Sequence, residues 1–339
     1  MRYRAMGSTG LMVSEVGLGG GGLGHIFGES TDALVAEAID YALSEGVNYI
    51  DVAPAYGDGR AEENLGKALE GRRDEVVVAT KFLLTPEDLD DIPGAIERHV
   101  GESLARLRMD HVDLFQMHNM VSREHGAIKQ TTVMGTKRES LGLASVLGSG
   151  GAVEGLQRVQ ASGAVRFIGF TGVGESGAVR EIMQSGALDA VQVYYNLLNT
   201  SAATPRAEGS TLHDHGQLLP LAQELGMAAI AIRNLAAGAL TPKVDRDVPP
   251  DSLVGRDLQR AERLAFLLQN GASISQLATR FVLQHPAVTT VVPGVKNRAE
   301  MEDALRAMEL PAISEADLAR VQQLADESFG VDEPPGSAL

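Results

Sequence analysis

The feature of this 339-residue sequence that most constrains its fold is a repeated unit of three parts. Each unit has an amphipathic stretch, then a glycine, then a short apolar run that ends in polar residues. It occurs as ALSEG-VNYIDVAP, QASG-AVRFIGFTG, MQSG-ALDAVQVYYN and QELG-MAAIAIRN. We expect the glycines to end helices in the left-handed conformation: Gly46, Gly163, Gly186 and Gly226. The apolar runs that follow are rich in β-branched residues, which is typical of strands buried inside a parallel sheet.

Eight apolar runs of this kind occur, near residues 13–20, 48–53, 76–82, 112–118, 165–172, 190–196, 227–234 and 288–294. Helical patterns separate most of them. Residues 31–45, for example, place one set of apolar side chains on a common face: Leu34, Val35, Ala38, Ile39, Ala42 and Leu43. Eight strands that alternate with helices predict a closed (β/α)8 TIM barrel and not an open doubly wound sheet.

The barrel pattern predicts one domain over residues 1–329, followed by an acidic, proline-bearing tail without fixed structure over 330–339. Three segments are longer than a barrel loop requires: 119–152, 197–212 and 236–254, after the fourth, sixth and seventh strands. All three leave the carboxyl ends of strands, where barrel enzymes build their sites. We therefore expect substrate selectivity to reside in these segments.

Composition narrows the possible functions. The net charge is −16, which would repel a polyanion, so we expect no nucleic-acid partner. The chain has no cysteine, which excludes disulfides, thiolate catalysis and iron–sulfur ligation. Neither a signal-peptide-like stretch nor a run of about 18 apolar residues is present, so we expect a soluble, cytoplasmic protein without a membrane partner.

Polar residues stand at the carboxyl ends of the second, third and fourth predicted strands. The second strand ends in NYIDVAPAYG, which places Asp51 at its end and Tyr56 in the loop. The third strand, VVVATKF, ends near Lys81, and the fourth, VDLFQMH, ends in His118. Neighbouring strands thus direct a carboxylate, a phenol, an ammonium and an imidazole toward one mouth.

This set of groups suits the donation of a proton to a carbonyl oxygen while a hydride reaches the carbonyl carbon. A free phenol has a pKa of about 10, and a nearby ammonium lowers it by stabilising the phenolate. Asp51 would keep Lys81 charged, and a neutral His118 would orient the substrate oxygen toward Tyr56. Each residue taken singly also fits a structural role, so the prediction depends on their joint placement.

The chain resembles the aldo-keto reductase superfamily from Tyr3 to about Asp326. YRAMGSTGLMVSEVGLGG is similar to the N-terminal hairpin and first strand of that family, and GVNYIDVAPAYGDGRAEENLGKAL to its most specific signature. The resemblance assigns the catalytic roles to Asp51, Tyr56, Lys81 and His118. It implies that an extended NADPH molecule lies across the barrel mouth, with NADH as a possible substitute, and that the substrate is a small carbonyl compound or sugar.

The resemblance also implies a set of cofactor contacts. Near the nicotinamide these are Gly20, Gly21, Asp51, Thr171, Gly172, Gln192 and Ile232, where Gly172 and Ile232 replace the usual asparagine and aromatic residue. Arg233 and Asn234 follow, and Arg233 suits either the pyrophosphate or a substrate anion. The 2′-phosphate and adenosine contacts are Gly294, Lys296, Asn297, Glu300 and Asp303, with Arg298 as a second candidate cation. The cation Lys296 favours NADPH over NADH.

Three other interpretations remain open from the sequence. The run GLGGGGLG opens no helix of a βαβ unit, so it is a weak dinucleotide fingerprint. The motif HDHG at 213–216 has a metal-ligand spacing but lacks further ligands, and we expect no metal. A Schiff-base aldolase that uses Lys81 and a regulatory protein that senses NADP are the alternative functions.

Overall fold

The computed structural model describes residues 1–26, 30–131, 137–244 and 246–334. Its centre is an eight-stranded parallel sheet in the order β14-β13-β12-β11-β6-β5-β4-β3. These strands are β3 (Leu18–Gly19), β4 (Tyr49–Asp51), β5 (Val77–Phe82), β6 (Val112–Met117), β11 (Val165–Thr171), β12 (Ala190–Tyr194), β13 (Ala228–Ile232) and β14 (Val288–Val291). Each lies within one of the eight runs predicted from the sequence.

The two edges of the sheet meet, which closes the barrel. Parallel bridges join Val16 to Val291 and Gly19 to Gly294. The Gly17 amide donates to the Val291 carbonyl over 2.8 Å, and the Gly19 amide donates to the Pro293 carbonyl over 2.9 Å. The predicted (β/α)8 class is confirmed.

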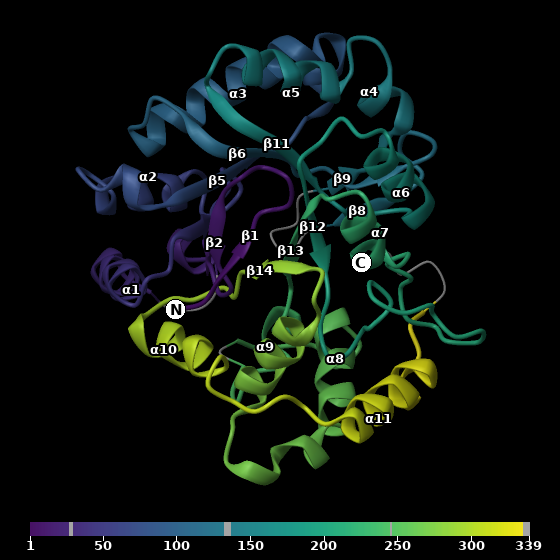
Figure 1. The fold of residues 1–339 in the computed structure, drawn as a ribbon. Helices are drawn as coiled ribbons and strands as arrows, with labels where there is room; N and C mark the ends of the chain where they lie inside the picture. Colours follow the sequence, from purple (N-terminus) through teal and green to yellow (C-terminus); the bar gives the residue numbers. More distant parts are fainter. Residues whose placement is uncertain (27–29, 132–136, 245, 335–339) are drawn as a thin grey trace.

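Helices surround the strands (Figure 1). They are α1 (Asp32–Ser44), α2 (Arg60–Ala68), α3 (Ile92–Leu107), α5 (Ala152–Ala161), α6 (Ser176–Gln184), α7 (Leu218–Glu224), α9 (Ile274–Gln284) and α10 (Arg298–Arg306). Outside this ring are α4 (Leu143–Leu147), α8 (Leu253–Glu262) and α11 (Glu315–Asp326). No helix in the described ranges is long and apolar enough to cross a membrane.

The glycines of the repeated unit have the conformation expected of them. Gly46, Gly163, Gly186 and Gly226 have φ angles of 85°, 82°, 69° and 65°. A residue with a β-carbon is strained in this left-handed region, so glycine is suited to ending a helix there. Local sequence thus sets where these four helices stop and where the next strand starts.

Two details differ from the sequence-based predictions. The run 13–20 is not one strand: β1 (Tyr3–Ala5) and β2 (Met12–Ser14) form an antiparallel hairpin, and β3 then enters the barrel. In α1, Val35 and Ile39 are buried, but Leu34 is 40% exposed. The barrel contacts a narrower stripe of this helix than the apolar pattern suggested.

The predicted tail differs from the expectation at its first residues. Glu333 forms ion pairs with Arg256 and Arg260 of α8, at 2.7 and 2.6 Å. Arg260 is 1% exposed and also donates to the Val331 carbonyl over 2.7 Å. Two arginines therefore attach residues 331–333 to the barrel, and residues 335–339 lie outside the described ranges.

The three long segments have different structures. Segment 119–152 contains short strands, β7 (Val121–Ser122), β8 (Lys129–Thr131), β9 (Lys137–Glu139) and β10 (Leu141–Gly142), and then α4; its residues 132–136 are not described. β8 and β9 pair as an antiparallel hairpin. Segment 197–212 has neither helix nor strand, and 236–254 contains one 3-10 turn (Ala236–Gly238) before α8.

Candidate active site

The four predicted catalytic residues lie at the ends of three adjacent strands and in the loop after the first of these strands. Asp51 is the last residue of β4, Lys81 is the fifth of the six residues of β5, and His118 directly follows β6. Tyr56 lies in the loop between β4 and α2. Parallel register brings the strand ends together, with Asp51 beside Ala79 and Lys81 beside Gln116.

The side chains of these residues converge. Lys81 Nζ forms a short ion pair with Asp51 and donates to the Val52 carbonyl over 2.9 Å. It also donates to the Tyr56 hydroxyl over 3.5 Å. The rings of Tyr56 and His118 meet edge to face, with centroids 6.0 Å apart. Asp51 and Lys81 are buried, whereas Tyr56 and His118 are partly exposed, so a substrate can reach the phenol and the imidazole.

Burial and neighbouring charges fix the protonation states. Burial raises the pKa of Tyr56, and the opposing charge of Lys81 does not cancel this effect, so the phenol keeps its proton at neutral pH. Burial alone would lower the pKa of Lys81, but Asp51 and Tyr56 raise it. Burial, with the charges of Lys81, Arg138 and Arg233, holds the pKa of His118 well below its usual range. The mouth thus contains a neutral phenol, an ammonium and a neutral imidazole.

The glycine-rich run after the first strand holds the Tyr56 loop close. A β-carbon on Gly24 would collide with the Tyr56 carbonyl, and one on Gly22 would collide with the Val295 carbonyl. The Gly20 amide donates to the Asp51 carbonyl over 2.7 Å. The run therefore allows close backbone contact with two loops of the mouth, and the weak fingerprint has a packing explanation.

A buried amide network surrounds Asp51. Gln192 Nε2 donates to Asp51 Oδ2 over 2.7 Å, and Thr171 Oγ1 donates to Gln192 Oε1 over 3.3 Å. The Gly172 amide donates to the Gln192 carbonyl over 2.8 Å. Gln192 is 1% exposed, so its first role here is to hold Asp51.

Gln116 belongs to the same network, and the sequence analysis missed it. Its Nε2 donates to Asp51 Oδ2 over 3.2 Å, while its Oε1 is buried and has no partner in the described structure. Gln116 lies two residues before His118 on β6 and so points to the same side of that strand. This two-residue spacing could have identified Gln116 as part of the site from the sequence.

The loop between β14 and α10 carries the residues predicted to hold the 2′-phosphate. Gly294 is exposed, and Lys296 pairs with Glu300 at 3.4 Å. Asn297 caps α10 by accepting a hydrogen bond from the Glu300 amide over 3.0 Å. The guanidinium of Arg298 lies 4.7 Å from the centre of the Tyr41 ring.

Two residues that were predicted to contact the cofactor make hydrogen bonds within the protein. Asp303 accepts hydrogen bonds from Ser275 Oγ and from Gln276 Nε2, at 2.5 and 2.7 Å, at the start of α9. Asn234 is 2% exposed and donates to Thr279 Oγ1 over 3.0 Å. Both side chains fasten α9, and their predicted cofactor contacts stay predictions.

The end of β13 carries a cation into the mouth. Ile232 is partly exposed, and Arg233 follows it with φ of 58°, a conformation that is uncommon for a residue with a β-carbon. The guanidinium of Arg233 lies 5.4 Å from the centre of the Tyr194 ring and is exposed. Its charge is one of those that lower the pKa of His118. Tyr194 was not predicted, although it ends β12 in the VQVYYN motif.

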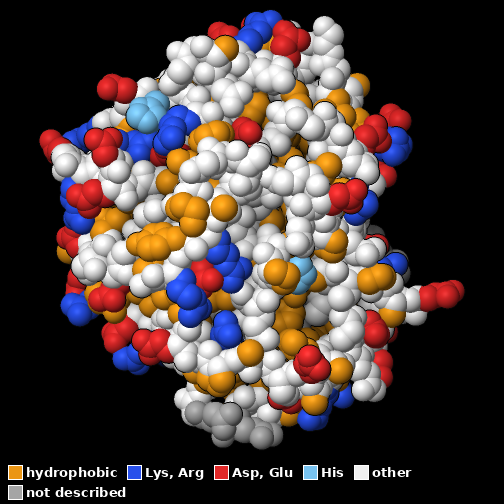
Figure 2. All heavy atoms as spheres, viewed as in Figure 1, with side chains coloured by type: hydrophobic (Ala, Val, Ile, Leu, Met, Phe, Trp, Pro, Cys, Tyr) orange, Lys and Arg blue, Asp and Glu red, His pale blue; other side chains and the backbone are white. Residues whose placement is uncertain are grey.

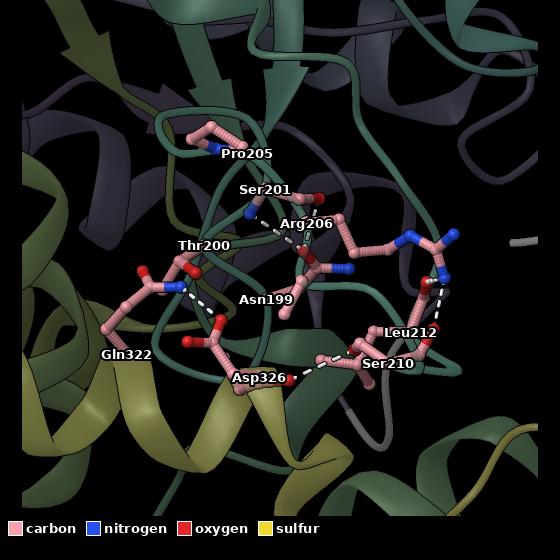
Figure 3. Close-up of a pocket in the computed structure, with 11 residues that line it drawn as sticks. Asn199, Thr200, Ser201, Pro205, Arg206, Ser210, Leu212, Gln322 and Asp326 are labelled. Carbon is pink, nitrogen blue, oxygen red and sulfur yellow. Dashed lines mark hydrogen bonds between the residues drawn. The ribbon is translucent and has the colours of Figure 1, made fainter.

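The segment after β12 is attached to α11. Thr204 Oγ1 donates to Gln322 Oε1 over 2.9 Å, and Ser210 Oγ donates to the Ala325 carbonyl over 3.1 Å. Figure 3 shows the small polar pocket between this segment and the helix, with Gln322 and Asp326 facing the segment. No member of the catalytic set lines the pocket, so this part of 197–212 has a packing role.

The two histidines of the HDHG motif lie next to each other, and His215 lies beside Tyr194. The rings of His213 and His215 are 4.7 Å apart, and His215 lies 5.6 Å from Tyr194. Burial lowers the pKa of both histidines. In the described part of the chain, no group of three metal-ligating side chains includes them.

Comparison with known proteins identifies the family of the chain. The family model described as "Aldo/keto reductase family" matches residues 15–326. The chain belongs to this family. Among curated relatives, L-galactose dehydrogenase of Arabidopsis thaliana is 27% identical, over 99% of this chain and 98% of the relative. D-threo-aldose 1-dehydrogenase of a Pseudomonas species is 28% identical, over 94% and 97%.

Solved structures of the family share the fold. An aldo-keto reductase from Bacillus halodurans in its holo form has a TM-score of 0.69 and 21% identity, covering 96% of each chain. An aldo-keto reductase from Klebsiella pneumoniae in complex with NADPH has a TM-score of 0.68 and 20% identity, covering 100% of this chain and 99% of the other. These similarities support the closed barrel described above.

Proposed function

We propose that this aldo/keto reductase transfers hydride between NADPH and the carbonyl of an aldehyde, ketone or sugar, with Tyr56 as the general acid. One observation carries the proposal: the partly exposed Tyr56 hydroxyl lies 3.5 Å from Lys81 Nζ and beside His118. A protonated phenol with an adjacent ammonium can deliver a proton to an oxygen bound at the mouth.

Each member of the set has a distinct task in this reaction. When held at the mouth, a reduced nicotinamide would supply the hydride that the carbonyl carbon receives. Tyr56 donates its proton to the carbonyl oxygen, and Lys81 stabilises the phenolate that remains. The neutral imidazole of His118 can donate a hydrogen bond that orients the carbonyl oxygen. Asp51 holds Lys81, and Gln116 and Gln192 hold Asp51.

The residues at the mouth fit a phosphorylated dinucleotide. Helix α10 directs its N-terminus at the β14–α10 loop, where amide groups favour an anion. Lys296 lies in that loop, and Arg233 adds a cation at the end of β13. This donor set suits the 2′-phosphate and the pyrophosphate, while Gly20, Gly21, Thr171, Gly172, Gln192 and Ile232 would border the nicotinamide.

Named relatives support the proposed substrate class and cofactor. Curated relatives include L-galactose dehydrogenase, D-threo-aldose 1-dehydrogenase and L-glyceraldehyde 3-phosphate reductase of Escherichia coli, the last at 26% identity. These names describe sugars and a short aldehyde. The Klebsiella pneumoniae structure contains NADPH, whereas an Escherichia coli relative is an NADH-specific methylglyoxal reductase. NADH therefore stays the alternative cofactor.

The geometry disfavours a Schiff-base aldolase. A Schiff-base lysine must lose its proton to attack a carbonyl, but Asp51 and Tyr56 raise the pKa of Lys81. Lys81 is also fully buried and is hydrogen-bonded to three oxygens. Borohydride treatment with a carbonyl compound should leave Lys81 unlabelled.

The decisive experiment follows NADPH absorbance while the protein is mixed with a panel of aldehydes, ketones and sugars. We expect turnover with at least one class, and we expect NADPH to bind to the protein alone. NADPH binding without turnover of any panel member would support the regulatory alternative. Absence of binding would contradict both the reductase and the sensor.

A further inference from the structure

Arg138 enters the mouth from outside the barrel strands. It is the middle residue of β9 and pairs through its backbone with Gln130 of β8. The next residue, Glu139, is exposed and pairs with Lys129 at 3.0 Å. Because side chains alternate along a strand, Arg138 projects to the opposite side of the hairpin from Glu139.

The base of the hairpin is anchored on that same inner side. Ser140 is fully buried, and its hydroxyl is 2.5 Å from Ser122 Oγ and accepts a hydrogen bond from the Ile128 amide over 3.0 Å. Arg138 is two residues from Ser140 and faces the protein in the same way. The hairpin is therefore fixed with its arginine directed inward.

The environment of Arg138 is the catalytic mouth. The ionisable groups that influence its pKa are the phenols of Tyr56 and Tyr194, and its own charge helps to lower the pKa of His118. No carboxylate from the described residues appears among these neighbours. Its Nε is buried and has no acceptor in the described structure.

A buried guanidinium donor without an acceptor is costly, so a ligand that supplies an acceptor gains binding energy there. The other two cations of the mouth differ in this respect. Lys81 pairs with Asp51, and the guanidinium of Arg233 lies against the Tyr194 ring and is influenced by the charge of Asp257. Of these three cations, Arg138 is the one with a buried donor that has no acceptor in the described structure.

We propose that Arg138 binds an anionic group, a carboxylate or a phosphate, on the carbonyl substrate itself, which makes it the specificity-determining residue of this active site. This inference rests on the proposed reductase function. The planar guanidinium can bind either oxyanion through two parallel hydrogen bonds. A substrate held at both ends would have its carbonyl at Tyr56 and its anion at Arg138.

The anion belongs to the substrate and not to the cofactor because of where Arg138 lies. The groups that fit the cofactor phosphates are on the β14–α10 loop and at the end of β13. Arg138 instead neighbours Tyr56 and His118, the two side chains that act on the substrate oxygen. A contact with NADPH is the competing outcome that the experiment must detect.

The test compares aldehydes that differ only in the anion. The pairs are 4-oxobutanoate with butanal, and glycolaldehyde phosphate with glycolaldehyde; the two pairs separate carboxylate from phosphate recognition. For the wild type we expect kcat/KM to favour the anionic member of at least one pair. In Arg138→Gln that ratio should fall about 10- to 100-fold, mainly through KM, as expected for loss of a charge-assisted contact. Arg138→Lys should restore part of it.

The matched control is Arg123→Gln, because Arg123 lies in the same segment but is exposed and pairs with Glu181 at 3.2 Å. This variant should keep the wild-type ratio. A wild-type ratio near one for both pairs, or a ratio unchanged in Arg138→Gln, would overturn the proposal. A weaker NADPH affinity in Arg138→Gln with the ratio unchanged would assign the arginine to the cofactor.

A binding measurement separates failure of this proposal from failure of the reductase function. Calorimetry with succinate, which carries carboxylates but no aldehyde, needs no turnover. If neither pair is reduced, the panel of aldehydes, ketones and sugars decides the reductase proposal, and succinate still reports on the subsite. Binding that is weakened in Arg138→Gln supports the anion subsite. No binding, or equal binding to wild type and variant, rejects it.

Discussion

The two ends of the barrel differ in how their charges are balanced. At the amino-terminal end, where the β1–β2 hairpin lies, two buried carboxylates each lie between two arginines. Figure 2 shows basic side chains gathered next to an acidic one near the middle of the face seen there. The ion pairs are Glu15 with Arg2 and Arg4 at 2.7 and 2.8 Å, and Asp113 with Arg73 and Arg166 at 2.7 and 2.6 Å. Asp113 also accepts a hydrogen bond from the Val78 amide over 2.8 Å. Both carboxylate oxygens of each acid thus pair with an arginine.

At the carboxyl-terminal end, three cations share a single carboxylate. One carboxylate, Asp51, is surrounded by Lys81 and two buried amides, and Arg138 and Arg233 add two further cations. The protein as a whole carries a net charge of −16, so this cationic mouth stands out against an acidic molecule. At the amino-terminal end, each arginine is thus paired with a buried carboxylate and joins neighbouring segments of the chain. At the carboxyl-terminal end, where we propose that ligands bind, Arg138 and Arg233 form no ion pair with a carboxylate of the described residues.

At the carboxyl-terminal end, we expect Tyr56→Phe to have the largest effect of all the variants. Loss of the proton donor should lower kcat for carbonyl reduction about 10²- to 10⁴-fold. The NADPH dissociation constant and the melting temperature should change little, because the ring remains. Steady-state absorbance and fluorescence titration measure the two effects. Tyr195→Phe, a buried tyrosine packed on Phe281, is the control and should keep its activity. Full activity of Tyr56→Phe would contradict the mechanism.

At the opposite end, Asp113→Asn should weaken folding and leave catalysis alone. Breaking two ion pairs of a buried carboxylate should cost about 1–3 kcal/mol, less than a fully buried pair because Arg166 is half exposed. Urea unfolding measures the free energy, and kcat/KM should remain near the wild-type value. A stable variant with impaired turnover would break the proposed division between the two ends.

Lys296→Ala should produce a smaller change, at the mouth. The KM for NADPH should rise about tenfold, the loss expected for one charged hydrogen bond of about 1.5 kcal/mol. The KM for NADH should move much less, since NADH lacks the 2′-phosphate. Lys67→Ala, in the last turn of α2, is the matched control. Equal changes for both cofactors would remove the reason to prefer NADPH.

The smallest effect is the pH dependence contributed by Glu15. Burial opposes ionisation of Glu15, but Arg2 and Arg4 outweigh it and lower its pKa from 4.5. A lowered native pKa adds stability above the unfolded value, and this stability is lost as the pH falls through the native value. Glu15→Gln should therefore be less stable than wild type at neutral pH by less than about 1 kcal/mol. The gap should narrow below pH 4.5 in thermal unfolding; a constant gap would show that the carboxylate charge is not responsible.

The sequence predicted the strands and the catalytic set because both depend on local patterns. A helix that ends at a left-handed glycine and an apolar run that follows it can be identified within about 15 residues. Asp51, Lys81 and His118 stand at or near the ends of such runs, and parallel strands align their ends. The barrel class and the shared mouth follow from these patterns without any knowledge of packing.

Only the tertiary structure decided how the side chains around that set are used. Asp303 of α10 and Asn234 after β13 both hydrogen-bond to residues of α9, a contact that their positions in the sequence did not indicate. Gln116 joins Asp51 across the intervening strand β5, and Tyr56 influences the pKa of Arg138, which lies on a hairpin more than 80 residues away in the sequence. Hydrogen bonds and charges act over a few ångströms in space, and local periodicity carries no information about such contacts.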